Sequence, residues 1–396
     1  MKIIPTIIAL LLCCLASHGS RLSPDAQVSL ITCQPGKEFY EAFGHTAIRI
    51  YDPVRGFDKA YNYGIFDFDR PDFYTNFAKG NLIYMLGVYS YPRFASSYIG
   101  ENRSVTEQVL NLTVEKKQSI YDYLEDNSQP SKREYTYHYF FNNCSTKPRD
   151  VIEAALGNKL HYDYSFIKKR MTIRQLVDEC TEENSWGDFG IDLALSHVID
   201  RPATDHEYLF IPEELMKAVA LATISDSSGT KPLVATTNKV YVAQAEPPLP
   251  KDVFSPLTVC WGIFLIVLLI TIFNVIKGKP GFWFDSMFFS VIGLLGLIMA
   301  LISFFTNHES SGNYNLLWAL PFHLIAAFLL PFKRVRKWLK YYFLISGIIL
   351  LVLLAFWWIL PQDLHYAVVP IILALLLRCA NVWYYENKAV KAVLQG

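Results

Sequence analysis

The chain has 396 residues, with equal numbers of acidic and basic residues and a formal net charge of zero. No overall electrostatic field marks it as a nucleic-acid-binding protein, and its length allows more than one domain. Charged and turn-forming residues concentrate before about residue 250, whereas long apolar runs dominate after it. This split predicts a soluble domain followed by a membrane domain.

The N-terminus has the pattern of a secretory signal peptide, at residues 1–19. Lys2 precedes an apolar run at residues 3–15, and small residues follow around Ala16 and Gly19. The apolar run is short for a membrane span. The pattern therefore predicts that the following domain is exported.

Cysteines are sparse in the exported chain. After removal of the signal the remaining ones are Cys33, Cys144, Cys180, Cys260 and Cys379. Cys33 and Cys180 could pair in an oxidising compartment, which would leave Cys144 free, but so few cysteines define no disulfide framework. Because no metal-type His/Cys spacing occurs, we expect neither a metal ion nor a cofactor.

The soluble domain, residues 20–245, alternates between strand and helix patterns. Strands are predicted at residues 26–32, 46–51, 59–68, 106–112 and, short and aromatic, 135–141. Helices are predicted at residues 114–127, 148–156, 172–195 and 213–222. The order of these elements indicates an α+β fold with a small antiparallel sheet.

Cys144 is the leading candidate for the chemical centre. It lies between the polar residues Asn143 and Ser145, after an aromatic stretch and before a helix that ends at Gly157. A thiol at a helix N-terminus faces the positive end of the helix dipole, which favours the nucleophilic thiolate. A buried structural cysteine is the alternative, but such cysteines usually lie among apolar residues.

A nucleophilic thiol needs a base, and His45 is the candidate. It follows Gly44 at the start of a predicted strand, where an imidazole can project into a cleft. A Cys–His pair also needs a polar group that holds the imidazole tautomer. Asn62 in the partner strand is the candidate for this group, with Asp52 and Asp67 as rivals.

A Pro-rich linker at residues 246–256 leads into the membrane domain, residues 257–396. Five apolar segments follow, at residues 257–276, 286–305, 316–332, 341–360 and 364–385. Most have the length that crosses about 30 Å of hydrocarbon, and the third is at the short end. We therefore predict five transmembrane helices.

The loops between these segments alternate in charge. Basic residues follow the first, third and fifth segments: Lys277, Lys279, Lys333, Arg334, Arg336, Lys337, Lys340, Lys388 and Lys391. The loops at residues 306–315 and 361–363 contain no Lys or Arg. By the positive-inside rule the first set faces the cytoplasm, so the soluble domain and the loop with His308 lie outside. His323 lies in the outer half of the third segment, where an ionisable group tends to be functional.

Several of these residues belong to motifs that resemble a known family. The motifs are Phe43-Gly44-His45-Thr46 with Arg49, Tyr61-Asn62-Tyr63-Gly64, Phe66-Asp67-Phe68, Asn143-Cys144-Ser145-Thr146 with Arg149-Asp150, Asp200-Arg201-Pro202, Phe210-Ile211-Pro212, and Asn307-His308 with Asn313, Asn315, Leu317-Trp318 and Pro321. In this order they resemble the Lnb-type lipoprotein N-acyltransferases of Bacteroides-like bacteria, whose periplasmic domain is also catalogued as DUF4105.

The resemblance implies a fold and an activity. The family domain is similar to circularly permuted papain-like (NlpC/P60-type) folds, in which the catalytic histidine precedes the cysteine. It implies a Cys–His acyltransferase with Cys144 as nucleophile and His45 as base. Further site candidates are Asn143, Tyr63, Arg149, His308 and Asn315.

The implied partners are lipids and lipidated proteins. The acyl donor would be a membrane phospholipid, and the acceptor the α-amino group of diacylglyceryl-cysteine apolipoproteins; no nucleic-acid partner is expected. The implied location is the bacterial cytoplasmic membrane, with the catalytic domain in the periplasm and the C-terminus in the cytoplasm.

Two other functions remain open at this point. The same dyad serves hydrolysis, so a membrane-tethered cysteine peptidase or amidase acting on cell-wall peptides is the alternative enzyme. Five spans count against it, because one span would suffice as an anchor. The other alternative is a non-enzymatic membrane binding module in which the Cys–His pair is fortuitous.

Overall fold

The computed structural model describes residues 21–182, 184–226, 229–245 and 253–395. The chain divides into two compact units: unit 1 comprises Met1–Asn76, Asn81–Arg170 and Ala203–Glu246, and unit 2 comprises Phe77–Gly80, Met171–Pro202 and Pro247–Gly396. The predicted signal peptide and most of the predicted linker lie outside the described residues. Each unit is described separately below.

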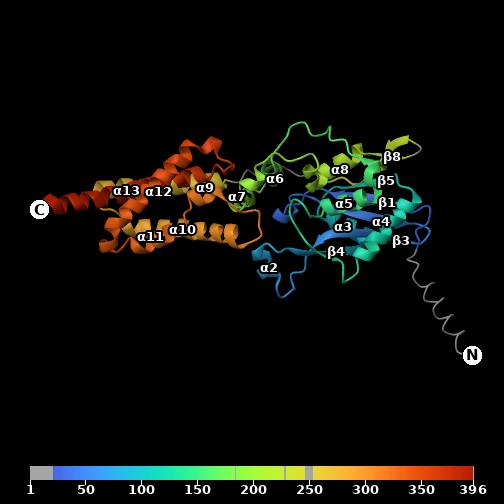
Figure 1. The fold of residues 1–396 in the computed structure, drawn as a ribbon, viewed down its shortest axis with the longest axis horizontal. Coiled ribbons are helices and arrows are strands. Elements are labelled where there is room, and N and C mark those ends of the chain that lie inside the picture. Colours follow the sequence, from blue (N-terminus) through green and yellow to red (C-terminus); the bar gives the residue numbers. More distant parts are fainter. Residues whose placement is uncertain (1–20, 183, 227–228, 246–252, 396) are drawn as a thin grey trace, which may run out of the picture. The chain divides into compact units, whose positions relative to one another are not determined.

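Unit 1 is built on a seven-stranded sheet with the order β10-β5-β1-β2-β3-β4-β6. The strands are β1 Gln27–Cys33, β2 His45–Asp52, β3 Phe57–Ile65, β4 Ile83–Ser90, β5 Val105–Leu110, β6 Glu134–Thr136 and β10 Val234–Tyr241. All six neighbouring pairs are antiparallel (Figure 1). A second, three-stranded sheet contains β7 Leu160–His161, β8 Thr223–Asp226 and β9 Gly229–Pro232.

Helices cover both faces of the larger sheet. Successive side chains of a strand point to opposite faces, so each face has apolar side chains that a helix can bury. The helices of unit 1 are α3 Tyr91–Gly100, α4 Val114–Asn127, α5 Thr146–Leu156, α8 Pro212–Leu221 and the first half of α2 Phe73–Lys79. Leu30 of β1 packs in the main core with side chains of α4, α5 and α8. Its neighbour Ile31 packs in a smaller core with α3.

The predicted α+β class and antiparallel sheet are confirmed, and α4 has the bounds that the sequence predicts. The strand predicted at residues 135–141 is shorter, because β6 ends at Thr136. After it, His138 and Asn142 form an isolated antiparallel bridge that closes a tight loop. This loop brings the chain back on itself just before Cys144.

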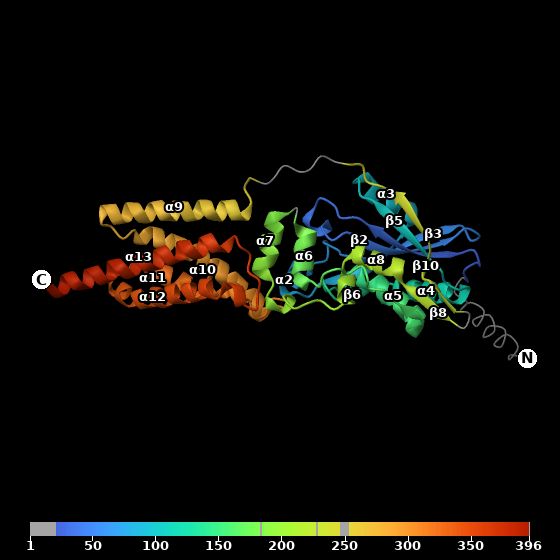
Figure 2. The ribbon, with the colours of Figure 1, turned by 90° about the horizontal axis from the view of Figure 1, so that it is seen from above.

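Unit 2 holds the apolar helices. Its helices are α6 Ile173–Thr181, α7 Ser185–Ala194, α9 Pro256–Lys277, α10 Phe282–Phe305, α11 Phe322–Leu329, α12 Lys333–Ala355 and α13 Val368–Gln395. Among the described residues, four helices are long and apolar enough to cross a membrane: α9, α10, α12 and the part of α13 up to Lys388. Within unit 2, α9 runs beside α13 (Figure 2).

The predicted third span is not a single helix of spanning length. It begins as a 3-10 helix, Tyr314–Leu317, breaks before Pro321, and continues as α11, which has eight residues. Eight helical residues are about 12 Å long, well short of the hydrocarbon thickness. α11 and the break before it pack closely against α10, since a Cβ at Gly296 would overlap the Ala319 carbonyl and one at Gly293 would lie 2.3 Å from the Leu324 nitrogen.

Residues 171–202 group with unit 2, whereas the sequence analysis placed them in the soluble domain. Both polar and apolar contacts hold them there. The Asn313 Nδ2 donates to the carbonyl oxygen of Leu193 at 2.7 Å, and the Gln362 Nε2 donates to that of Leu195 at 3.0 Å. Phe189 of α7 packs against the apolar core of the membrane helices. Alternating polar and apolar residues predict helices here but do not show which core the helices join.

Candidate functional site

Cys144 lies immediately before α5, where Asn143 fixes the backbone. The Asn143 Oδ1 accepts hydrogen bonds from the N–H groups of Ser145 at 2.8 Å and Thr146 at 2.9 Å. Its Nδ2 donates to the carbonyl oxygens of Tyr139 at 2.8 Å and Phe210 at 2.9 Å. Asn143 therefore satisfies two unpaired N–H groups of the helix start and positions the neighbouring cysteine.

His45 is the first residue of β2 and lies opposite Cys33 of β1. Its ring stacks on Tyr98 of α3, with centroids 6.0 Å apart and planes 20° from parallel. Its Nε2 lies 2.5 Å from the Oδ1 of Asn62 in β3. Of the candidates for the third polar group, the structure therefore places Asn62 against the imidazole, while Asp52 binds Ser23 instead.

Cys144 and His45 both lie beside Gly64. A Cβ on this glycine would lie 3.3 Å from the Cβ of Cys144 and 3.8 Å from the Cε1 of His45. The glycine has a φ of +95°, a left-handed conformation that residues with a Cβ rarely adopt. A side chain at this position would contact both residues, so the glycine leaves room beside the cysteine and the imidazole.

Burial dominates the electrostatics of the pair. It raises the pKa of the Cys144 thiol to about 11, although the backbone N–H groups of Thr46 and Cys144 itself act in the opposite direction. It lowers the pKa of His45 to about 4, against the effect of the hydrogen bond that the imidazole donates to Asn62. At neutral pH the resting pair is therefore a neutral thiol and a neutral imidazole, and the thiolate expected from the helix dipole is not favoured.

Two further candidates in unit 1 point away from this pair. The Tyr63 hydroxyl donates to the Oδ1 of Asn127 at 2.6 Å, and the Tyr63 ring is part of the main core. Arg149 binds the carboxylate of Asp150, its neighbour on α5. Each residue is held in place by a partner outside the Cys–His pair.

The two remaining candidates lie in unit 2. The Nε2 of His308 lies 3.2 Å from the carbonyl oxygen of Phe77. Asn315 is buried, with Nδ2 donating to the carbonyl of Asp192 and Oδ1 accepting from the Trp318 indole. These contacts tie the loop before α11 to α7 and to residues 77–80.

The cysteine pairing considered for Cys33 does not form, because Cys33 is a free, buried thiol. Burial raises its pKa far above the usual range, so it stays protonated. Sequence reasoning assigned no role to Gly64, although this glycine belongs to one of the motifs given above. A glycine inside an otherwise regular strand pattern is the one signal that could have indicated the close approach.

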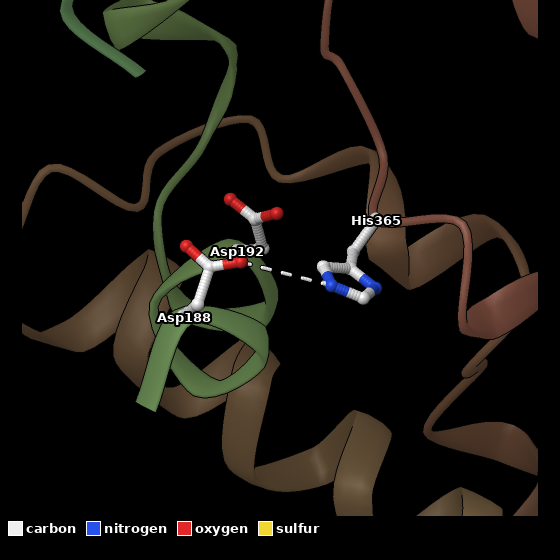
Figure 3. A group of neighbouring side chains, drawn as sticks. All are labelled: Asp188, Asp192 and His365. Carbon is white, nitrogen blue, oxygen red and sulfur yellow. Dashed lines mark ion pairs between the residues drawn. The ribbon is translucent and has the colours of Figure 1, made fainter. Parts of the chain in front are cut away.

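Unit 2 contains a separate cluster of Asp188, Asp192 and His365, whose potential ligand atoms lie within 4.8 Å of one another. Figure 3 shows the Asp188 carboxylate facing the ring, with the His365 Nε2 3.7 Å from an Asp188 oxygen. The His365 Nδ1 accepts the Ala367 N–H, so Nε2 carries the ring proton. Because Asp192 is bound by Arg174, the contacts of this cluster are those of an ion-pair network.

Comparisons with known proteins match both halves of the chain. Residues 20–179 match the family described as the Lnb N-terminal periplasmic domain, which includes His45, Asn62 and Cys144. Residues 249–389 match the Lnb transmembrane domain. No curated protein and no solved structure matches the chain.

Proposed function

The chain belongs to the Lnb-type family, as a membrane protein with a periplasmic domain, and from this premise we propose that it is a lipoprotein N-acyltransferase with Cys144 as nucleophile. The observation that carries the proposal is that Cys144 and His45 both lie beside Gly64, with Asn62 bound to the imidazole. A Cys-His-Asn set is the cysteine variant of the catalytic triad.

The same residues support a circularly permuted papain-like fold for unit 1. In this chain the histidine precedes the cysteine by about a hundred residues, and the cysteine lies at the start of α5, which packs on an antiparallel sheet. The histidine and the asparagine come from neighbouring strands, β2 and β3. This is the arrangement that the sequence resemblance implies.

In the first half-reaction an acyl chain moves from a phospholipid to the enzyme. As the Cys144 sulfur attacks the ester carbonyl, His45 accepts the thiol proton. The N–H groups of Thr46 and Cys144 that face the sulfur are placed to stabilise negative charge on the tetrahedral intermediate. When the ester bond breaks, His45 returns the proton to the departing lysolipid oxygen, and a thioester remains on Cys144.

In the second half-reaction the α-amino group of a diacylglyceryl-cysteine apolipoprotein attacks the thioester. His45 takes a proton from the attacking amine, an amide bond forms, and the proton returns to the sulfur as the C–S bond breaks. Cys144 is regenerated as a thiol. Neither half-reaction requires an oxidant, a metal ion or a cofactor.

The membrane orientation is part of the proposal. We assign the broken segment from Tyr314 to Leu329 as the fifth crossing, together with the four long helices. With five crossings, the basic residues at the end of α9 (Lys277), at the start of α12 (Lys333 and Arg334) and in the last part of α13 (Lys388) all face the cytoplasm. Unit 1 and the loop at residues 306–315 then face the periplasm. Donor and acceptor are both anchored in the same membrane, which raises their effective concentration at Cys144.

The test is mass spectrometry of the full-length protein after incubation with detergent micelles of dipalmitoylphosphatidylethanolamine. We expect a hydroxylamine-sensitive palmitoyl thioester on Cys144. Cys144→Ala should abolish it, and the matched control Cys260→Ala, a change in α9, should retain it. In cells, N-acylation of lipoproteins by the Cys144→Ala protein would contradict the proposal.

The same experiment separates the alternative functions. Release of peptidoglycan fragments without acylation of Cys144 would favour a cysteine peptidase or amidase. A Cys144 that reacts neither with the lipid nor with thiol reagents would favour a binding module.

A further inference from the structure

Aromatic rings form a continuous run beside Cys144 in unit 1. Tyr137 stacks on Tyr84, with centroids 4.3 Å apart and planes 25° from parallel. The ring centroids of Tyr84 and Phe66 are 5.3 Å apart, and those of Phe66 and Phe68 are 4.6 Å apart. Phe73 of α2 contacts Phe68 at 5.0 Å. We call these five residues the aromatic track.

One end of the track lies at the thiol. Tyr137 immediately precedes the loop that the His138–Asn142 bridge closes, and Asn143 and Cys144 directly follow it. Burial raises the pKa of the Tyr137 hydroxyl, and the next largest cause is the charge of Cys144, which also acts on the hydroxyl of Tyr84. The first ring of the track therefore belongs to the short stretch of chain that carries the nucleophile.

The other end of the track is open to the surroundings. Phe68 is 59% exposed, an unusual position for a large aromatic ring that contacts two others. Arg70, two residues further along, is paired with Asp72 at 2.9 Å and with Glu134 at 3.2 Å. The track itself consists of aromatic rings only, from the loop that carries Cys144 to an exposed ring.

We propose that the aromatic track binds the acyl chain of the lipid donor, an inference that rests on the proposed function. The ester carbonyl must contact the Cys144 sulfur, and the methylene chain begins at that carbonyl. A chain that leaves the sulfur along Tyr137, Tyr84 and Phe66 transfers its methylenes to an apolar surface, which is favourable for each methylene. Rigid aromatic rings provide that surface with little loss of side-chain entropy.

The rings of the track differ in their distance from the reacting carbonyl carbon. Tyr137 and Tyr84 contact the first methylenes of any donor, whereas Phe68 and Phe73 contact only methylenes far from the carbonyl. The outer rings therefore determine the preference for long chains. They are not needed for the chemistry itself.

The test compares Phe68→Ala and Phe73→Ala with the wild-type full-length protein. Acylation of Cys144 is followed by mass spectrometry with dipalmitoylphosphatidylethanolamine or dihexanoylphosphatidylethanolamine in the same detergent micelles. We expect each variant to be acylated about tenfold more slowly by the dipalmitoyl donor and within about twofold of wild type by the dihexanoyl donor. Tyr40→Ala is the matched control, because Tyr40 is an exposed aromatic residue, 73% accessible, outside the track.

Each other outcome has a separate meaning. Variants that react with both donors at the wild-type rate, or that lose both equally, would overturn the acyl-chain site while leaving the proposed function intact. Loss of the long-chain preference in Tyr40→Ala as well would also overturn it. Wild-type protein that forms no thioester with either donor would overturn the proposed function itself.

Discussion

The Nε2 of His45 lies 2.5 Å from the Oδ1 of Asn62. An amide oxygen can only accept a hydrogen bond, so the proton of the neutral imidazole resides on Nε2. Nδ1 is then left with its lone pair and is the atom that can receive the proton of Cys144. The two residues come from neighbouring antiparallel strands, so the register of β2 and β3 determines which ring nitrogen is the base.

Removal of this hydrogen bond should slow acyl transfer. Asn62→Ala leaves the imidazole free to rotate and to change tautomer, and we expect the rate of Cys144 acylation to fall about 10- to 100-fold. Donor affinity should change little. Asn62→Asp restores an acceptor and adds a charge that favours imidazolium, so it should recover part of the rate at high pH. A wild-type acylation rate in Asn62→Ala would exclude this role.

The pH dependence of acyl transfer should reflect the lowered pKa of His45. Because burial brings this pKa to about 4, the imidazole remains an unprotonated base at pH 5. We expect kcat/KM to stay high from pH 7 to pH 5 and to fall as the pH drops through about 4. Initial rates across pH 3.5–8 measure this, and half-loss near the ordinary histidine value of 6.5 would contradict it.

The same shift predicts how stability depends on pH. The unfolded chain binds a proton at His45 below about pH 6.5, whereas the folded chain does so only near 4. Folding stability should therefore fall as the pH drops from 6.5 to 4, by up to about 3 kcal/mol. Thermal unfolding at several pH values should show this loss, and His45→Gln should reduce it.

Gly64→Ala should block the site. The added Cβ meets both Cys144 and His45, and the positive φ adds strain of about 1 kcal/mol. We expect Cys144 acylation to be almost abolished. Gly56→Ala is the matched control, since Gly56 has a φ of +71° and nothing lies within 4 Å of an added Cβ. Equal activity of the two variants would show that Gly64 does not govern the approach of thiol and imidazole.

Asn143→Ala should destabilise unit 1 as well as reduce activity. It removes the cap of α5 and leaves the carbonyls of Tyr139 and Phe210 without their donor, a loss of about 2–4 kcal/mol. Thermal unfolding of the purified protein measures the loss. Asn184→Ala removes a cap that accepts one N–H on α7 and should have an effect of about 1 kcal/mol. Asn143→Ala should therefore destabilise the protein more than Asn184→Ala does.

The proposed orientation is testable with introduced cysteines. Ser311, in the loop after α10, and Lys337, in the first turns of α12, are both exposed, and the charge pattern assigns them to opposite sides of the membrane. In spheroplasts, a membrane-impermeant maleimide should label Ser311→Cys, whereas Lys337→Cys should react only after permeabilisation. The unsubstituted protein gives the background from its own cysteines. Labelling of Lys337→Cys in sealed spheroplasts would reverse the assignment.

Local patterns in the sequence predict much of unit 1. The alternation of residues 26–32 and the capped helix beginning after Thr113 reappear as β1 and α4. The strand β4 and the helix α3 were not predicted; β4 ends at Ser90 and α3 begins at Tyr91, so no loop separates the two elements in the sequence. The elements of unit 1 that were not predicted depend on tertiary contacts rather than on a local sequence pattern.

The site shows the same division. Cys144 and His45 stand out by their neighbours in the sequence, and Asn62 by its place in the partner strand. The buried state that raises the pKa of Cys144 comes from packing around the loop, which a helix-dipole argument on the sequence alone cannot include. The loop before α11 is likewise fixed by a hydrogen bond from Asn315 to the carbonyl of Asp192, a residue distant in the sequence that no local pattern marks as a neighbour.

The membership of residues 171–202 in unit 2 has a consequence for how this protein can be rearranged in evolution or in the laboratory. Asn313 and Gln362 donate hydrogen bonds to the carbonyls of Leu193 and Leu195, so this insert and the membrane loops recognise each other through specific groups. A hybrid of two relatives joined at the linker would exchange the helices but keep the foreign insert. Such hybrids should assemble well only when residues 171–202 and the membrane helices come from the same relative. The two discontinuous segments are therefore inherited as a single module.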